Sequence, residues 1–228
     1  MKKTSFVLLL ALSQCLAAQN LQTDLSLKYL VTLPTEKTEK LPVIILSHGY
    51  GSNESDLISL GTNLSKSSLT ISVRAPMPIS ENAFQWFPIG KDADATESTR
   101  LLAAFISEIV KKYKADPKNV TLIGFSQGAM MCYQIGLQHP ELVKAIAPLS
   151  GRILPTLKAK IKLGTNLKNL KVFIAHGDAD NRVPYAEAVA AEMYLKILKN
   201  APEFKTYKNL QHSISSEEIA DLTLWLNK

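Results

Sequence analysis

Cysteine is scarce in this sequence, and long hydrophobic runs are absent from it. The 228 residues contain two cysteines, Cys15 and Cys132. We expect Cys15 to be removed with an N-terminal segment, so no disulfide forms within the remaining chain, and an oxidising compartment is tolerated rather than used. No apolar run reaches the roughly 18 residues that a membrane-spanning helix needs. These absences argue against a protein held together by disulfides and against an integral membrane protein.

The sequence also lacks a cluster of charge of one sign. Lys and Arg number 26 against 20 Asp and Glu, and the formal net charge of +6 is spread along the chain. Nucleic-acid binding requires a basic face rather than a modest overall excess, so this charge gives no case for a nucleic-acid partner. With 46% hydrophobic and 20% charged residues and no low-complexity tract, the chain is expected to fold around a sizeable core.

The first eighteen residues have the pattern of a secretory signal peptide. Lys2 and Lys3 precede a short apolar run at 6–12, and small residues end at Ala18. We expect cleavage after Ala18, a single catalytic domain over 19–228, and a periplasmic or secreted protein. A lipoprotein signal with a lipidated Cys15 is the weaker alternative, because the residue before Cys15 is not small. A buried N-terminal helix or strand is the structural alternative.

Short apolar runs alternate with longer segments of helical periodicity along the rest of the chain. Strands are predicted at 27–33, 43–47, 70–74, 120–125, 144–149, 171–176 and 203–207. Several of these runs are continuously apolar, as is typical of strands buried on both faces. Helices are predicted at 97–114, 186–198 and 215–227, the last of which opens with capping-box spacing. This order predicts one α/β domain with a mainly parallel central sheet and helices on both faces.

A Gly-x-Ser-x-Gly pattern follows the predicted strand 120–125. Gly124, Ser126 and Gly128 lie between this strand and a helix-compatible segment at 129–137. In a sharp strand-to-helix turn, such glycines allow a close backbone approach, and the turn holds the serine hydroxyl above the sheet. The bare pattern occurs by chance, but its place between a strand and a helix favours a nucleophilic Ser126 over an inert serine.

A serine nucleophile needs a base, and the base needs an acid that orients it. In this fold class, the acid and then the base follow the nucleophile along the chain. His212 lies after the last predicted strand and before the C-terminal helix, which is the position that this order gives to the base. Asp178 and Asp180 follow the strand 171–176. Either of them could reach the base, and spacing alone does not choose between them. A surface loop histidine and turn-forming aspartates are the structural alternatives.

Acyl transfer also requires two converging N–H donors for the oxyanion. The backbone N–H of Gln127, the residue after the nucleophile, is one candidate. Tyr50, in the glycine turn that follows the strand 43–47, is the other. His48 then has a structural role as a hydrogen-bonded loop histidine. No pair of histidines has metal-ligand spacing on one element, so no metal site is expected.

Seven short motifs occur in the order in which they are found in the phospholipase/carboxylesterase family of α/β hydrolases. They are LSHGYG (46–51), RAP (74–76), WF (86–87), GFSQGA (124–129), LSG (149–151), HGDAD (176–180) and HS (212–213). Each motif alone is modest, but their order is specific and covers nearly all of the chain after residue 18. The sequence therefore resembles the small bacterial carboxylesterases and acyl-protein thioesterases of this family, and the resemblance implies an α/β-hydrolase fold.

Residue by residue, the resemblance implies that Ser126 is the nucleophile, His212 the base and Asp180 the acid. Tyr50 and Gln127 correspond to the oxyanion donors. The implied activity is hydrolysis of carboxylic esters with short- to medium-chain acyl groups through an acyl-enzyme. Lysophospholipids and thioesters belong to the same substrate class, and no cofactor is implied.

The substrate pocket is expected to be apolar, and Trp86, Phe87 and Leu57 are the candidates to line it, with ordinary packing as the alternative. The basic stretch at 158–162, continued by Lys168 and Lys171, is compatible with peripheral contact with an anionic membrane, although such stretches are more often solvated. Both a monomer and a homodimer are compatible with the sequence.

Two other function classes are weaker. A serine peptidase of the same fold is disfavoured because the domain leaves no room for an added lid or propeller. A non-catalytic binding protein is disfavoured because the serine, aspartate, histidine and glycine turn are all intact.

Overall fold

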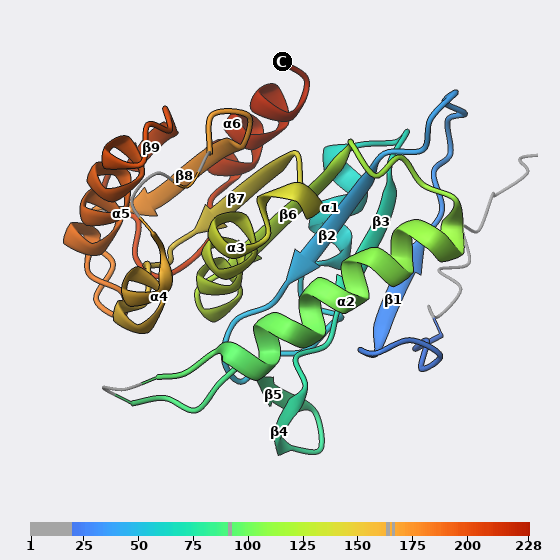
Figure 1. Ribbon diagram of the computed structural model, residues 1–228, viewed down its shortest axis with the longest axis horizontal. Helices are drawn as coiled ribbons and strands as arrows, with labels where there is room; N and C mark the ends of the chain where they lie inside the picture. The colour runs from blue at the N-terminus through green and yellow to red at the C-terminus, as the bar shows by residue number, and fades with distance from the viewer. Residues whose placement is uncertain (1–19, 91–92, 163–164, 166) are drawn as a thin grey trace, which may run out of the picture.

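A seven-stranded sheet forms the centre of the molecule (Figure 1). The structure is a computed structural model that describes residues 20–90, 93–162, 165 and 167–228. The predicted signal peptide and Cys15 lie outside the described residues.

The strand order is β1-β3-β2-β6-β7-β8-β9. β1 runs antiparallel to β3, and every other pairing in this sheet is parallel. The strands are β1 (Tyr29–Thr32), β2 (Val43–Ser47), β3 (Leu69–Val73), β6 (Val120–Phe125), β7 (Ala145–Leu149), β8 (Lys171–Gly177) and β9 (Glu203–Tyr207).

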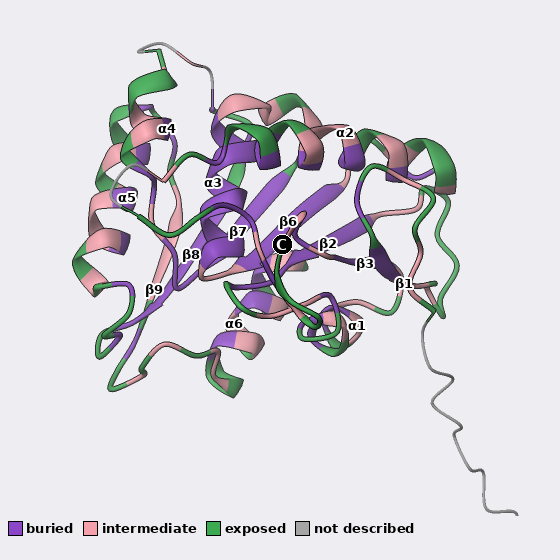
Figure 2. Cartoon of the chain, turned by 90° about the horizontal axis from the view of Figure 1, so that it is seen from below, coloured by how far each residue is buried: buried purple, intermediate pink, exposed green. Residues whose placement is uncertain are grey.

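Helices cover both faces of the sheet (Figure 2). One face packs against α2 (Thr96–Tyr113), α3 (Gln127–Gln138), α4 (Pro155–Lys160) and α5 (Tyr185–Ile197). The other face packs against α1 (Ile58–Leu64) and α6 (Ser216–Leu226). The predicted fold class is therefore confirmed. No helix of the described ranges is both long enough and apolar enough to cross a membrane.

The continuous apolar run of β2 has a direct structural cause. Val43 and Ile45 belong to the core cluster on the α2–α3 face, whereas Ile44 and Leu46 belong to the cluster on the α1–α6 face. Successive side chains of a strand point to opposite faces, and both faces of this sheet are covered. All five residues of β2 are consequently buried.

The observed elements match the predicted strands and helices within one or two residues, and the exceptions are short. Helices α1 and α4 and the two-stranded hairpin of β4 (Met77–Ser80) and β5 (Ala83–Gln85) were not predicted, and a single 3₁₀ turn covers Pro140–Leu142. Helices α1 and α4 have only seven and six residues, too few to show a helical period, and β4 is mostly exposed and forms no continuous apolar run. The predicted cap of α6 is present, because the Ser215 hydroxyl accepts a hydrogen bond from the Glu218 N–H at 3.1 Å.

Candidate active site

Ser126 sits at a sharp turn between β6 and α3, and its backbone has φ 56° and ψ −113°. The Ser126 N–H donates to the Leu149 carbonyl at 2.9 Å, which ties the turn to β7. The two glycines of the motif are required because neighbouring backbone atoms lie too close to leave room for a side chain. A Cβ added to Gly128 would lie 1.9 Å from the Ser47 carbonyl oxygen, and one added to Gly124 would lie 2.2 Å from the Gly128 carbonyl oxygen. The turn therefore depends on glycine at both positions.

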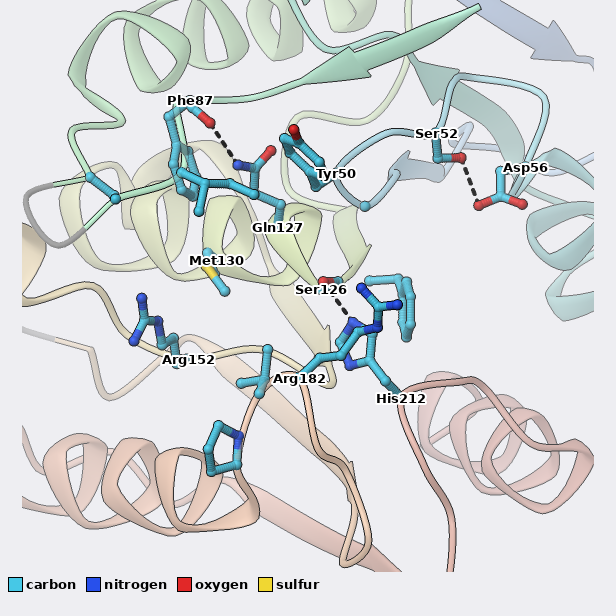
Figure 3. A pocket seen from close by; sticks show the side chains of 17 residues that line it. Tyr50, Ser52, Asp56, Phe87, Ser126, Gln127, Met130, Arg152, Arg182 and His212 are labelled. Carbon is cyan, nitrogen blue, oxygen red and sulfur yellow. Dashed lines mark hydrogen bonds between the residues drawn. The ribbon is translucent and has the colours of Figure 1, made fainter. Parts of the chain in front are cut away.

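Ser126, His212 and Asp180 form one chain of hydrogen bonds (Figure 3 shows the first two residues). Ser126 Oγ lies 2.8 Å from His212 Nε2, and His212 Nδ1 lies 2.7 Å from Asp180 Oδ2. A carboxylate only accepts, so Nδ1 carries the imidazole proton and Nε2 accepts from the serine hydroxyl. The His212 ring also packs against Phe125, with the ring centroids 4.8 Å apart. The imidazole is thus held in the tautomer that a general base requires.

Asp180 is buried and fully hydrogen-bonded. Its Oδ1 accepts from the N–H groups of Arg182 and Val183, each at 2.9 Å. Burial alone would raise the pKa of this carboxyl. The hydrogen bonds from His212, Val183 and Arg182 outweigh burial and hold the pKa of Asp180 below its ordinary value. Asp178 is exposed and accepts instead from the Asn209 N–H at 2.6 Å. The structure therefore brings Asp180, rather than Asp178, against His212.

His176 lies next to the hydrogen-bonded Ser126–His212–Asp180 chain, and sequence analysis predicted no role for it. Its side chain is fully buried, and its Nε2 lies 2.8 Å from the Val183 carbonyl and 3.4 Å from Asp180 Oδ2. Burial lowers the pKa of His176, so the ring is neutral and donates from Nε2. It supports the same turn that supplies Val183 N–H to Asp180. Only its position at the end of the predicted strand 171–176 indicated that His176 would lie near Asp180.

The two candidate oxyanion donors line the same cavity as Ser126. Gln127 is the first residue of α3, so its N–H has no acceptor within the helix. Tyr50 lies in the loop after β2. The loop approaches the nucleophile closely, because a Cβ added to Gly49 would lie 3.3 Å from Ser126 Cβ. This arrangement places two backbone segments beside the serine hydroxyl.

The Tyr50 loop is fixed by contacts with the β4–β5 hairpin. Gly51 N–H donates to the Phe84 carbonyl, and Phe84 N–H donates to the Ser52 carbonyl, both at 2.9 Å. Arg74 adds a two-pronged ion pair with the largely buried Glu54, at 2.5 Å for each hydrogen bond. The Arg74 guanidinium also lies over the Phe84 ring, 4.4 Å from its centroid. The Tyr50 loop is therefore held by contacts with elements outside the central sheet.

His48 holds the start of this loop, in agreement with its predicted structural role. The ring is fully buried, and its Nε2 accepts from the Ala75 N–H at 3.0 Å. Nδ1 must then carry the proton, which it donates to the Gly49 carbonyl at 2.8 Å. Burial lowers the pKa of His48, so a neutral ring is favoured. Its carbonyl accepts from the indole N–H of Trp86 at 2.9 Å.

The Gln127 side chain has a role that sequence reasoning missed. Its Oε1 accepts from the Trp86 N–H, and its Nε2 donates to the Phe87 carbonyl, both at 2.7 Å. These two bonds hold the segment after β5 against the start of α3. Figure 3 shows the bond between Gln127 and Phe87. The sequence offered no signal for this contact beyond the amide side chain itself.

A cavity of about 620 Å³ opens over Ser126 and His212. Phe87 lines it, as expected, but Trp86 and Leu57 do not, which corrects two predictions. Trp86 is fully buried with its indole directed to the His48 carbonyl, and Leu57 is buried in the core cluster that contains α1 and α6. Because the Trp86 indole is turned away toward the His48 carbonyl, only Phe87 of these two consecutive residues faces the cavity. Its other apolar lining residues are Ile89, Ala93, Phe125, Met130, Val183 and Pro184.

Metal binding has no support in the described part of the chain, where no group of three or more His, Cys, Asp or Glu side chains is placed to hold a metal ion.

Comparison with known proteins identifies the family of this chain. The family model described as Phospholipase/Carboxylesterase matches residues 30–228. Acyl-protein thioesterase 1 of Mycosarcoma maydis is 31% identical over 240 residues, which cover 89% of this chain and 97% of that protein. The crystal structure of esterase PE8 has a TM-score of 0.75 at 28% identity, covering 86% of this chain and 96% of the other. The Bacillus cereus carboxylesterase structure has a TM-score of 0.77 at 24% identity, covering 88% and 93% of the two chains, and shows the shared fold.

The fold, the family match and the similar proteins together define the class: the chain belongs to the phospholipase/carboxylesterase family of α/β hydrolases. It is a hydrolase of the carboxylesterase type, a serine hydrolase that acts on esters.

Proposed function

We propose that the protein hydrolyses carboxylic esters through a triad of Ser126, His212 and Asp180. The continuous hydrogen-bonded chain from Ser126 Oγ through His212 to Asp180 carries this proposal. The supporting observations are the strained serine turn and the apolar cavity above it. Short- to medium-chain acyl esters are the proposed substrates, and lysophospholipids and thioesters share the required acyl chemistry.

The mechanism has two halves that use the same groups. His212 takes the proton of Ser126 as the hydroxyl attacks the ester carbonyl, and the ionised Asp180 stabilises the imidazolium that forms. The N–H groups of Tyr50 and Gln127 bind the oxyanion. The imidazolium then protonates the leaving alcohol. Water attacks the acyl-enzyme with His212 again as the base, which releases the acid and restores Ser126.

A p-nitrophenyl ester series from acetate to palmitate tests the proposal on protein that starts at Gln19. We expect turnover to peak at a short or medium chain, because the cavity volume of about 620 Å³ is that of a typical small-molecule site. Ser126→Ala should lower kcat by a factor of about 10⁴ or more and leave stability nearly unchanged. Turnover that survives in folded Ser126→Ala protein would rule out the triad. A butyrylthiocholine and butyrylcholine pair would separate thioester from ester preference.

A further inference from the structure

Two arginines face the same cavity as the nucleophile. Arg152 and Arg182 both line the cavity above Ser126, and Figure 3 shows their side chains below Met130 and beside His212, respectively. They come from different strand ends, because Arg152 follows β7 and Arg182 follows β8. The proposed chemistry uses neither guanidinium.

The backbone of each arginine is held by the structure that forms the site. Arg182 N–H donates to Asp180 Oδ1 at 2.9 Å, which fixes the residue beside the acid. Arg152 follows Gly151, where an added Cβ would lie 2.4 Å from Ala129 Cβ, so this segment packs tightly against α3. The backbone of each arginine is therefore held by contacts with Asp180 or α3, which also position the triad.

The hydrogen-bonding capacity of the two guanidinium groups is largely unused. In the part of the chain that the structure describes, Arg152 has one carboxylate neighbour, Glu187, at 3.7 Å, which is an ion-pair distance but too long for a hydrogen bond. Among the described residues, no carboxylate lies within ion-pair distance of the Arg182 guanidinium. Each guanidinium has five N–H donors in a planar fork that suits a carboxylate or phosphate.

Among the described residues, the one carboxylate that lines the cavity lies away from Arg152. Asp56 also lines the cavity, accepts from the Ser52 hydroxyl at 2.8 Å, and lies beside Ser52 at the opposite side of the view in Figure 3. The apolar lining is interrupted on the Arg152 side by positive charge. Arg182 is exposed and 36% of the Arg152 side chain is exposed, so a substrate group at the mouth of the cavity can reach both guanidinium groups.

We propose that Arg152 and Arg182, which line different sides of the cavity, each offer a position for an anionic group and together form its anion-binding subsite, so that the preferred ester substrate carries a carboxylate or phosphate. This inference rests on the proposed ester hydrolysis and narrows its substrate class. The charged group lies on either the acyl part or the alcohol part of the ester, since both parts meet at Ser126.

Matched ester pairs that differ in one charge test the subsite. In the acyl arm, p-nitrophenyl hydrogen glutarate is compared with p-nitrophenyl methyl glutarate. In the alcohol arm, 3-acetoxybenzoate is compared with methyl 3-acetoxybenzoate. Ser126→Ala protein supplies the blank for spontaneous hydrolysis. We expect kcat/KM to be about tenfold higher for the charged member in at least one arm, and this preference should shrink as salt is added.

The arginine variants show whether the preference belongs to this subsite. Arg152→Gln/Arg182→Gln should lower the ratio of charged to neutral kcat/KM about tenfold. Arg100→Gln is the matched control, because Arg100 is exposed on α2 and pairs with Glu97. It should leave the ratio unchanged. Equal hydrolysis of charged and neutral esters in both arms would overturn the subsite while leaving the esterase proposal standing.

If no ester is hydrolysed, a binding measurement still tests the anion-binding subsite independently of the proposed esterase activity. Calorimetry on Ser126→Ala protein compares monoethyl glutarate with diethyl glutarate. We expect tighter binding of the monoanion and loss of this difference in the triple variant with Arg152→Gln and Arg182→Gln. Equal binding of the two compounds would overturn the subsite whatever the activity.

Discussion

The backbone of Ser126 is held at a φ of 56°, a region that residues other than glycine seldom occupy. Such a conformation costs about 1–3 kcal/mol and persists only where its surroundings enforce it. Here the enforcement comes from the Leu149 carbonyl and from two glycines packed against β2 and α3. The strain lifts the hydroxyl out of the sheet toward His212. At the scale of the residue, the strained backbone of Ser126 is thus maintained by the packed residues around it.

The choice of acid can be tested at the same scale with two isosteric variants. Asp180→Asn should lower kcat by about 10³-fold or more, because the amide can no longer stabilise the imidazolium of His212. Asp178→Asn should change kcat less than threefold, since Asp178 is exposed and binds only the Asn209 N–H. Steady-state kinetics on one p-nitrophenyl ester measure both. A larger loss at Asp178 would show that the assignment of the acid is wrong.

Gly128 tests the packing of the turn. Gly128→Ala places a methyl group 1.9 Å from the Ser47 carbonyl, so we expect the free energy of unfolding to fall by about 2 kcal/mol or more. Gly90→Ala is the control, because nothing lies within 4 Å of a Cβ at that position. Urea denaturation compares the two variants. Equal stabilities would mean that the close approach of Gly128 to β2 is absent in solution.

At the scale of the element, α6 contains a buried carboxyl that no described group pairs. Glu218 is fully buried, and neither of its side-chain oxygens has a hydrogen-bond partner among the described residues. Burial raises its pKa from 4.5 to about 8, and the influence of the nearby Ser215 backbone on the carboxyl offsets this only in part. The helix follows directly after the His212 loop, so its stability bears on the position of the base.

The pKa of Glu218 predicts a pH-dependent loss of stability. The folded state holds the Glu218 proton up to about pH 8, whereas the unfolded chain releases it near its ordinary pKa. This contribution to stability is complete below pH 4.5 and is lost as the pH rises through about 8, at a cost of a few kcal/mol. Glu218→Gln cannot lose a proton, so it should gain stability over the wild type as the pH rises from 5 to 9. A constant difference in unfolding free energy across this range would contradict the raised pKa.

At the scale of the whole molecule, the site is assembled at the carboxyl ends of neighbouring strands. The Tyr50 loop follows β2, Ser126 follows β6, Asp180 follows β8 and His212 follows β9. Parallel strands bring these ends to one edge of the sheet. Residues as far apart in the sequence as Tyr50 and His212, 162 positions, therefore come together because of the strand order. The helices on both faces hold that order by burying every position of β2 and β3.

Much of this arrangement could be predicted from local patterns. Continuous apolar runs predicted the buried strands, and the order of serine, aspartate and histidine predicted which residues would meet. The contacts that depend on side-chain direction could not be predicted. Trp86 turns into the core because its indole N–H reaches the His48 carbonyl, and the Gln127 amide binds the backbone at Trp86 and Phe87. Such hydrogen bonds join segments that are distant in the sequence and have no common hydrophobic pattern. No sequence pattern therefore predicts them.

Labelling with a fluorophosphonate tests the central claim most directly. A hydroxyl activated by His212 attacks the phosphorus, and the reagent then remains on the serine. In folded protein starting at Gln19, we predict one adduct per chain, located at Ser126 by peptide mass spectrometry. Ester hydrolysis should be lost in proportion to labelling. The absence of an adduct, or an adduct on another residue that accounts for the loss of activity, would contradict the triad of Ser126, His212 and Asp180.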